Sequence, residues 1–88
     1  MFSKNPKLDK QARSVEDALI KFHQRDQKKN NPYEGMCYCA SVCMKKLAGR
    51  DVILWKTRDH NNQFHWWCET QEGEVIDITA EQYTLNNL

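Results

Sequence analysis

Three short runs rich in β-branched and aromatic residues follow one another in the second half of the chain, and their order limits the possible folds. We expect strands over residues 51–58 (DVILWKTR), 64–70 (FHWWCET) and 74–78 (EVIDI). Polar turns are expected between them, at 59–62 and 71–73. Because such short connections join antiparallel neighbours, the pattern predicts a three-stranded antiparallel meander.

The first half of the chain shows helical spacing instead. Apolar residues recur three and four positions apart from Val15 onward, and Ser14 begins a capping-box pattern. Together these features predict a helix from Val15 to about Lys28. The more polar residues 1–13 are interpreted as a flexible N-terminal arm.

A second helix is expected over residues 36–48, and Gly49, the next residue, is expected to end it. One stripe of this helix is predicted to be buried against the sheet. The stripe comprises Cys37, Ala40, Ser41, Met44, Leu47 and Ala48. Two helices followed by the meander make an α+β fold, with residues 14–88 forming a single domain.

Composition excludes several classes of protein. The net charge is +1, and basic residues occur only as short pairs, which argues against a nucleic-acid partner. No run approaches the roughly 18 apolar residues of a membrane span, so no membrane partner is expected. The N-terminus lacks the apolar core of an export signal, so we expect a cytoplasmic protein whose four cysteines are thiols. No cofactor is expected.

A cysteine at a helix start, a strand histidine and a strand aspartate occur in the order of a cysteine-nucleophile site. These are Cys37, His65 and Asp77. A helix N-terminus and a neighbouring imidazolium lower the pKa of a thiol, and Asp77 would orient and stabilise the charged ring. The backbone N–H of Cys37 is the natural oxyanion donor, and Asn31 or Gln63 is the candidate for the second.

This site depends on the register of the last hairpin. A two-residue loop would place Asp77 on the opposite sheet face from His65. A three-residue loop over 71–73 makes the two residues diagonal neighbours on one face. That loop favours glycine in a left-handed conformation at its third position, and Gly73 occupies that position.

The segments that carry these residues resemble the papain-like and transglutaminase-like cysteine superfamily. In that superfamily a G-x-C motif opens a helix, H-x-W follows on a strand, and an aspartate lies on the next strand. The corresponding segments here are 35–41 (GMCYCAS), 65–67 (HWW) and 73–80 (GEVIDITA). The likeness covers roughly residues 33–83 and is strongest to small uncharacterised phage and bacterial proteins with a GxCYxAS…HWW…D-x-TAEQ pattern.

The resemblance implies a minimal papain-like core with Cys37 as nucleophile, His65 as base and Asp77 as orienting acid. It implies a small hydrolase or acyl transferase, of the protease, amidase or transglutaminase type, acting on a protein or peptide. A phage origin, with a host protein as partner in the host cytoplasm, is implied by the resemblance alone. From their residue type, Trp66 and Trp67 are interpreted as core or cleft-wall residues.

Other interpretations of the same residues stay open. A non-catalytic phage-type protein could bind and modulate a host protein while keeping a relic of the triad. The candidate nucleophile could be a buried structural cysteine, and Asp77 could cap the turn at Thr79. Cys39 and Cys43, one helical turn apart, form a weak zinc signature that would suit a zinc-stabilised binding module. We interpret them, with Cys68, as core thiols, so no metal is expected.

Overall fold

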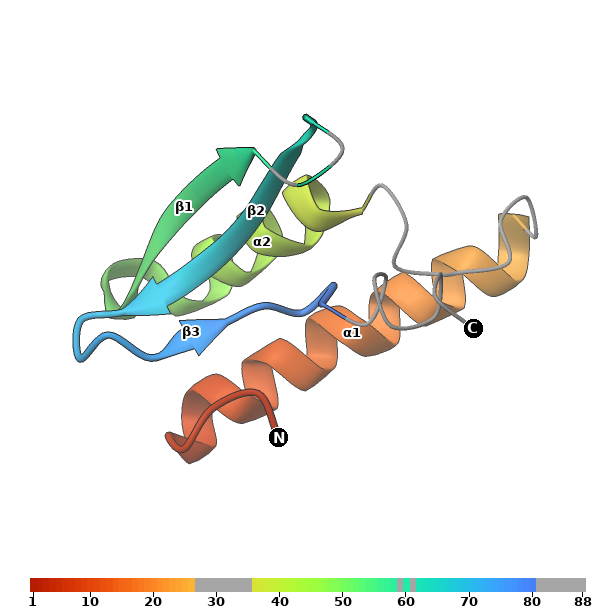
Figure 1. Ribbon diagram of the computed structural model, residues 1–88. Coiled ribbons are helices and arrows are strands. Elements are labelled where there is room, and N and C mark those ends of the chain that lie inside the picture. Colours follow the sequence, from red (N-terminus) through yellow and green to blue (C-terminus); the bar gives the residue numbers. More distant parts are fainter. Residues whose placement is uncertain (27–35, 59, 61, 81–88) are drawn as a thin grey trace.

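The computed structural model of the protein describes residues 1–26, 36–58, 60 and 62–80. Within these residues the chain forms two α-helices followed by a three-stranded antiparallel sheet (Figure 1). The elements are α1 (Pro6–Asp26), α2 (Cys37–Ala48), the 3-10 turn η1 (Gly49–Asp51), β1 (Val52–Arg58), β2 (Phe64–Thr70) and β3 (Val75–Ile76). The α+β fold expected from the sequence is therefore confirmed.

The first helix begins earlier than predicted, because Asn5 caps it. The Asn5 side-chain oxygen accepts hydrogen bonds from the backbone N–H groups of Lys7 and Leu8, at 3.0 and 3.2 Å. Pro6 occupies the first helical position, where an N–H would have no partner inside the helix. The prediction of Ser14 as the cap is wrong, because its hydroxyl donates to a carbonyl one turn earlier within α1.

The first thirteen residues are consequently not a flexible arm, and they form part of the domain. Leu8 and Ala12 are buried in the core. The segment before the helix is also held in place, because the Glu74 carboxylate accepts hydrogen bonds from the Ser3 hydroxyl and the Lys4 backbone N–H, at 2.5 and 2.9 Å. The prediction failed because the helical apolar spacing extends back to Leu8 through a sequence of mostly polar and charged residues.

The second helix covers almost the residues predicted for it. Gly49 ends it with a positive φ of 60°, and its N–H donates to a carbonyl of the last helical turn. The predicted stripe is buried except for Leu47, which is exposed. Cys39 and Cys43 are exposed too, so the interpretation of these two as core thiols is wrong. These three side chains line a surface groove between α1 and α2, which the helices do not close.

The sheet has the register that the candidate site requires. The strands lie in the order β1-β2-β3, and β3 pairs with β2 through Cys68 with Ile76 and Glu69 with Val75. The three-residue loop predicted for the hairpin is thereby confirmed. Gly73 has a φ of +89°, in the left-handed region, and donates its N–H to the carbonyl of the last β2 residue at 2.9 Å.

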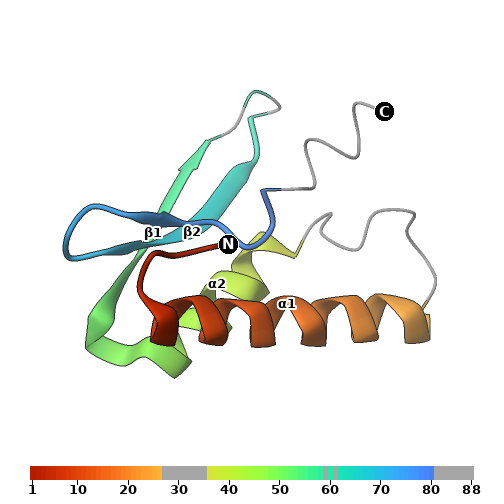
Figure 2. The ribbon, with the colours of Figure 1, turned by 90° about the horizontal axis from the view of Figure 1, so that it is seen from below.

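The helices lie on one side of the sheet. Figures 1 and 2 show α2 running along the sheet and α1 beside α2. Met44 of α2 is completely buried, and Cys68 donates its S–H to the Ser41 carbonyl at 3.3 Å. The core comprises Leu8, Ala12, Val15, Ala40, Met44, Ala48, Val52, Cys68, Ile76 and Ile78.

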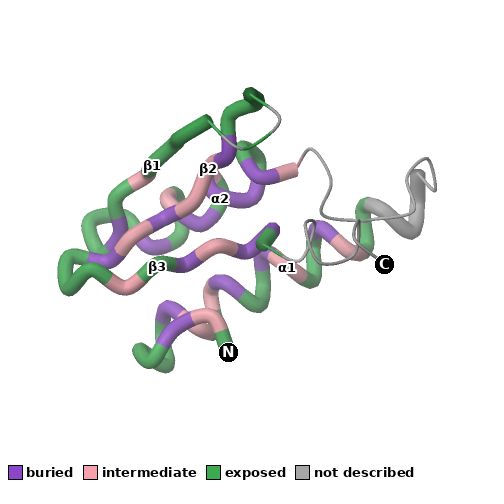
Figure 3. Tube along the Cα trace, viewed as in Figure 1, coloured by how far each residue is buried: buried purple, intermediate pink, exposed green. Residues whose placement is uncertain are grey.

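The opposite sheet face is open. Figure 3 shows exposed residues along most of β1, in contrast to the alternation of buried and exposed residues along the helices. Ile53, Trp55 and Val75 are exposed apolar residues, and the alternation of the strands places them together on this outer face. Among the described residues, no helix has the length and apolar character needed to cross a membrane.

Candidate active site

Three elements supply the residues of the candidate site. Cys37 is the first residue of α2, His65 is the second residue of β2, and Asp77 directly follows β3. The register of the β2–β3 hairpin puts Asp77 on the same face as Trp67 and diagonal to His65. The chain therefore brings His65 and Asp77 into contact.

His65 and Asp77 form a short polar contact. Nε2 of the ring lies 2.6 Å from Oδ2 of the carboxylate, and the side chains are only 10% and 22% exposed. Because the carboxylate can only accept, Nε2 is the donor. The carboxylate faces the ring and does not cap the following turn, in which the Asp77 backbone carbonyl accepts the N–H of Ala80 at 3.4 Å.

The candidate nucleophile lies against the start of β2. The Cys37 thiol is buried and donates to the carbonyl of Phe64 at 3.8 Å. Phe64 is joined to His65 by a peptide bond, so the thiol is held beside the backbone that carries the histidine. The first N–H groups of a helix have no partners within it, and that of Cys37 opens α2, where an oxyanion could be bound.

The second nitrogen of the His65 ring, Nδ1, is not the atom that contacts the aspartate. Nδ1 is buried, as is the ring as a whole. Because Nε2 donates to Asp77, Nδ1 is the ring nitrogen whose lone pair can accept a proton. Trp67 stacks beside the ring, with centroids 6.1 Å apart and planes inclined by 21°. His65 thus lies on the sheet face of Trp67 and Trp55, whereas α2 packs on the other face, and its buried thiol meets β2 at the Phe64 carbonyl.

The two tryptophans predicted as cleft walls lie on different faces of β2. Trp67 shares the face of His65, whereas Trp66 packs against Tyr38 of α2, with ring centroids 4.9 Å apart. Sequence analysis did not single out Tyr38, although it directly follows the candidate nucleophile. Its position as the second residue of a helix could have identified it, because consecutive helical side chains point in different directions.

The remaining candidates are placed differently. Gln63 is exposed immediately before β2. The second oxyanion candidate, Asn31, lies outside the described residues, as does Lys28, the predicted end of the first helix. The described residues contain no group of three or more His, Cys, Asp or Glu side chains that could hold a metal ion.

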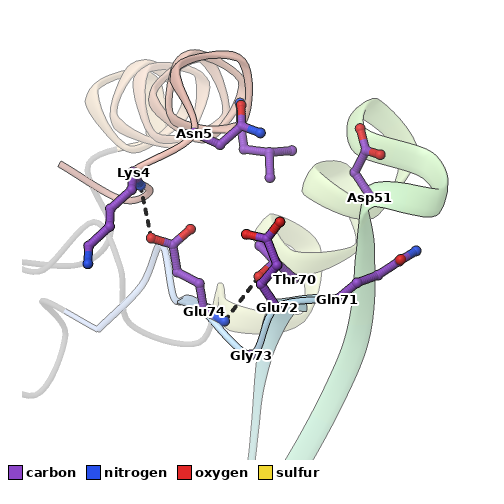
Figure 4. Close-up of a pocket in the computed structure, with 9 residues that line it drawn as sticks. Lys4, Asn5, Asp51, Thr70, Gln71, Glu72, Gly73 and Glu74 are labelled. Atoms are coloured by element: carbon purple, nitrogen blue, oxygen red, sulfur yellow. Dashed lines mark hydrogen bonds between the residues drawn. The ribbon is translucent and has the colours of Figure 1, made fainter.

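Two hollows on the surface lie away from these residues. One, of about 560 Å³, is lined by Lys4 and Asn5 at the N-terminus, by Asp51 and by the β2–β3 turn. Figure 4 shows these side chains around the opening, with Glu74 bonded to Lys4 and to Thr70. The other, of about 460 Å³, is the apolar groove between α1 and α2. Neither is lined by Cys37, His65 or Asp77.

Comparison with known proteins gives a family and no activity. No curated protein and no solved structure matches the chain. A family model described as YunG protein matches residues 12–88, which include most of α1, all of α2 and the whole sheet. The chain therefore belongs to the YunG family.

Proposed function

We propose that the protein is a small cysteine-dependent hydrolase or acyl transferase, with Cys37 as nucleophile, His65 as base and Asp77 as the acid that orients it. The observation that carries the proposal is the 2.6 Å contact between His65 Nε2 and Asp77 Oδ2, formed beside the strand residue that the Cys37 thiol touches. A carboxylate on one ring nitrogen fixes the imidazole and stabilises its protonated form. That form in turn stabilises a thiolate.

The reaction begins with transfer of the thiol proton from Cys37 to Nδ1 of His65. The thiolate attacks the carbonyl carbon of an amide, thioester or isopeptide, a carbon–sulfur bond forms, and the carbonyl electrons move onto oxygen. When the tetrahedral adduct collapses, the bond to the leaving group breaks. The His65 imidazolium supplies the proton that an amine leaving group takes.

The resulting thioester is resolved by a second nucleophile. Water gives hydrolysis, and an amine gives acyl transfer. His65 takes the proton of the incoming nucleophile while the carbon–sulfur bond to Cys37 breaks, which restores the starting enzyme. The N–H groups at the start of α2 are the donors for the oxyanion in both steps.

Rates of alkylation test this proposal, because the chain contains its own control thiols. Cys39 and Cys43 are exposed, whereas Cys37 is buried. At about pH 6 an ordinary thiol is almost wholly protonated. We expect iodoacetamide to modify Cys37 faster than both exposed cysteines, with peptide mapping to assign the sites. His65→Ala should slow the modification of Cys37 and leave the other two rates unchanged.

The proposal fails if Cys37 reacts no faster than Cys39 and Cys43. Such a result would favour the second candidate function, a non-catalytic protein that binds and modulates a host protein. The exposed outer sheet face, with Ile53, Trp55 and Val75, supports that candidate, because apolar residues gathered on a surface mark interaction sites. Cys37→Ala would then leave the interaction unchanged. The four free thiols fit a reducing compartment, and we place either function in the cytoplasm.

A further inference from the structure

Two cations and three aromatic rings gather beside the candidate nucleophile, and the proposed chemistry does not use them. Lys56 and Arg58 come from β1, Phe64 and Trp66 from β2, and Tyr38 from α2. We refer to these five residues as the cationic–aromatic cluster. All are exposed except Trp66, which is half-buried.

Sheet register creates the cluster. Lys56 pairs directly with Trp66 across the strands, and Arg58 pairs with Phe64. The Lys56 ammonium lies 4.7 Å from the Phe64 ring centroid and 5.2 Å from that of Trp66. The Arg58 guanidinium lies 4.9 Å from the Phe64 ring. These are cation–π distances, and Tyr38 meets Trp66 edge-on from the helix. The rings therefore restrict two long cationic side chains to one area.

The described residues supply no carboxylate that pairs with the charges of this cluster. Across the described part of the chain, no carboxylate lies within 4.0 Å of the charged nitrogens of Lys56 or Arg58. Arg58 donates to the backbone oxygen and side-chain oxygen of Asn62, which are both uncharged acceptors. Two positive charges thus face solvent on a preorganised aromatic support.

The cationic–aromatic cluster lies next to the Cys37 thiol. Tyr38 directly follows Cys37, and the carbonyl of Phe64 is the group that the thiol contacts. Figures 1 and 2 show that the β1–β2 hairpin extends beyond α2 at this end of the sheet. A chain segment that lies on the cluster consequently passes close to Cys37.

We propose that the cationic–aromatic cluster binds an acidic peptide segment, with at least two carboxylates, next to Cys37. Fixed guanidinium and ammonium groups pair well with carboxylates, and the rings offer apolar contact to the stems of glutamate side chains. That this segment belongs to the acyl donor rests on the function proposed above. A single-stranded nucleic acid fits less well, because base stacking requires open ring faces and both cations already lie over the Phe64 ring.

Binding is measured without the chemistry, using Cys37→Ser protein and a fluorescein-labelled hexaglutamate peptide in an anisotropy titration. We expect saturable binding that weakens with salt. Lys56→Gln and Arg58→Gln should each weaken it by about two- to fivefold, and by about tenfold together. The matched control is Lys21→Gln with Arg50→Gln, which removes the same charge from exposed positions outside the cluster and should leave the affinity nearly unchanged.

Three results would overturn the proposal. They are absence of hexaglutamate binding, equal weakening by the control pair, and tighter cluster-dependent binding of a labelled oligothymidylate. Alkylation of Cys37 is measured separately on protein with the native cysteine. Hexaglutamate binding without selective Cys37 alkylation would count against the proposed function and would still support the acidic-segment site. Selective alkylation of Cys37 without peptide binding would support the proposed function and count against the acidic-segment site.

Discussion

At the scale of single residues, His65 determines what the candidate site can do. Its ring is buried, and Nε2 donates to the Asp77 carboxylate at 2.6 Å. This contact fixes the tautomer in which Nδ1 carries the lone pair. The base of the proposed triad requires a fixed ring orientation of this kind.

Asp77→Asn removes the carboxylate charge and keeps the shape of the side chain. Because the carboxylate orients the His65 ring in the proposed triad, its loss should impair the base that activates the thiol. We expect the iodoacetamide rate of Cys37 to fall by about tenfold or more. Glu69→Gln is the matched control, because Glu69 lies on the same face of β2 and should have no such effect. Equal rates in Asp77→Asn and wild type would exclude Asp77 from the site.

Cys68 is a buried thiol in the core, and its burial gives a prediction at alkaline pH. Burial raises the pKa of its thiol to about 11 from an ordinary value of 9.0. In the unfolded chain the thiol ionises near 9, so its contribution to stability is complete below that pH and is lost as the pH rises toward 11. The loss is at most about 3 kcal/mol.

The measurement is the free energy of unfolding across this alkaline interval. Cys68→Ala should show a shallower decline than wild type, whatever its stability at neutral pH. Cys43→Ala removes an exposed thiol and should follow the wild-type slope. Identical slopes in all three proteins would mean that the Cys68 thiol does not stay protonated in the folded state.

At the scale of elements, the turn between β2 and β3 fixes the geometry of the site. Gly73 has a φ of +89°, and a Cβ there would meet no atom within 4 Å. Gly73→Ala therefore introduces backbone strain without a clash, and we expect a loss of about 1–2 kcal/mol in the free energy of unfolding. Gly73→Asn should lose less, because asparagine tolerates this conformation. Denaturant unfolding measures both, and equal stability of alanine and glycine would contradict the turn.

The same turn also holds the N-terminus. Hydrogen bonds from the Ser3 hydroxyl and the Lys4 N–H lower the pKa of Glu74 below its ordinary value. The stability that these hydrogen bonds contribute is present above the pKa of Glu74 in the unfolded chain, about 4.5. It is lost as the pH falls through the lower pKa of Glu74 in the folded protein. We expect the amide proton shift of Lys4 to titrate with Glu74, below pH 4.5. Glu74→Gln should abolish this titration, whereas Glu72→Gln, on the same turn, should preserve it. An unchanged titration in Glu74→Gln would contradict the contact.

At the scale of the whole molecule, the parts that could be predicted were those fixed by local rules. The second helix and the first two strands followed from the sequence pattern, and the hairpin register followed from the glycine that its turn requires, Gly73. The third strand is shorter than the predicted 74–78, because only Val75 and Ile76 pair with β2. The early start of α1 was missed because Leu8 and Ala12 are isolated among charged residues, and only their burial shows them as one stripe. The approach of Cys37 to the Phe64 carbonyl was also beyond prediction, because it depends on how α2 crosses the sheet.

The N-terminal half of α1 tests whether the scaffold and the site are separable. Leu8 is 4% exposed and belongs to the core, although the YunG family match begins only at residue 12. Leu8→Ala should lower the free energy of unfolding by about 2–5 kcal/mol, a large share of what a domain of this size has. Leu47→Ala makes the same substitution at a position that is 53% exposed, and it should cost much less.

Thermal unfolding gives the two stabilities, and Cys37 alkylation well below the midpoint gives the state of the site. Leu8 lies in the core shared by the helices and the sheet, whereas His65, Asp77 and the Cys37 thiol are held by the start of β2, the end of β3 and the first turn of α2. We therefore expect the Leu8→Ala protein to keep the alkylation rate of wild type while folded. A slower rate at a temperature where the variant is fully folded would show that α1 positions the site, and that the N-terminal residues belong to its function as well as to its stability.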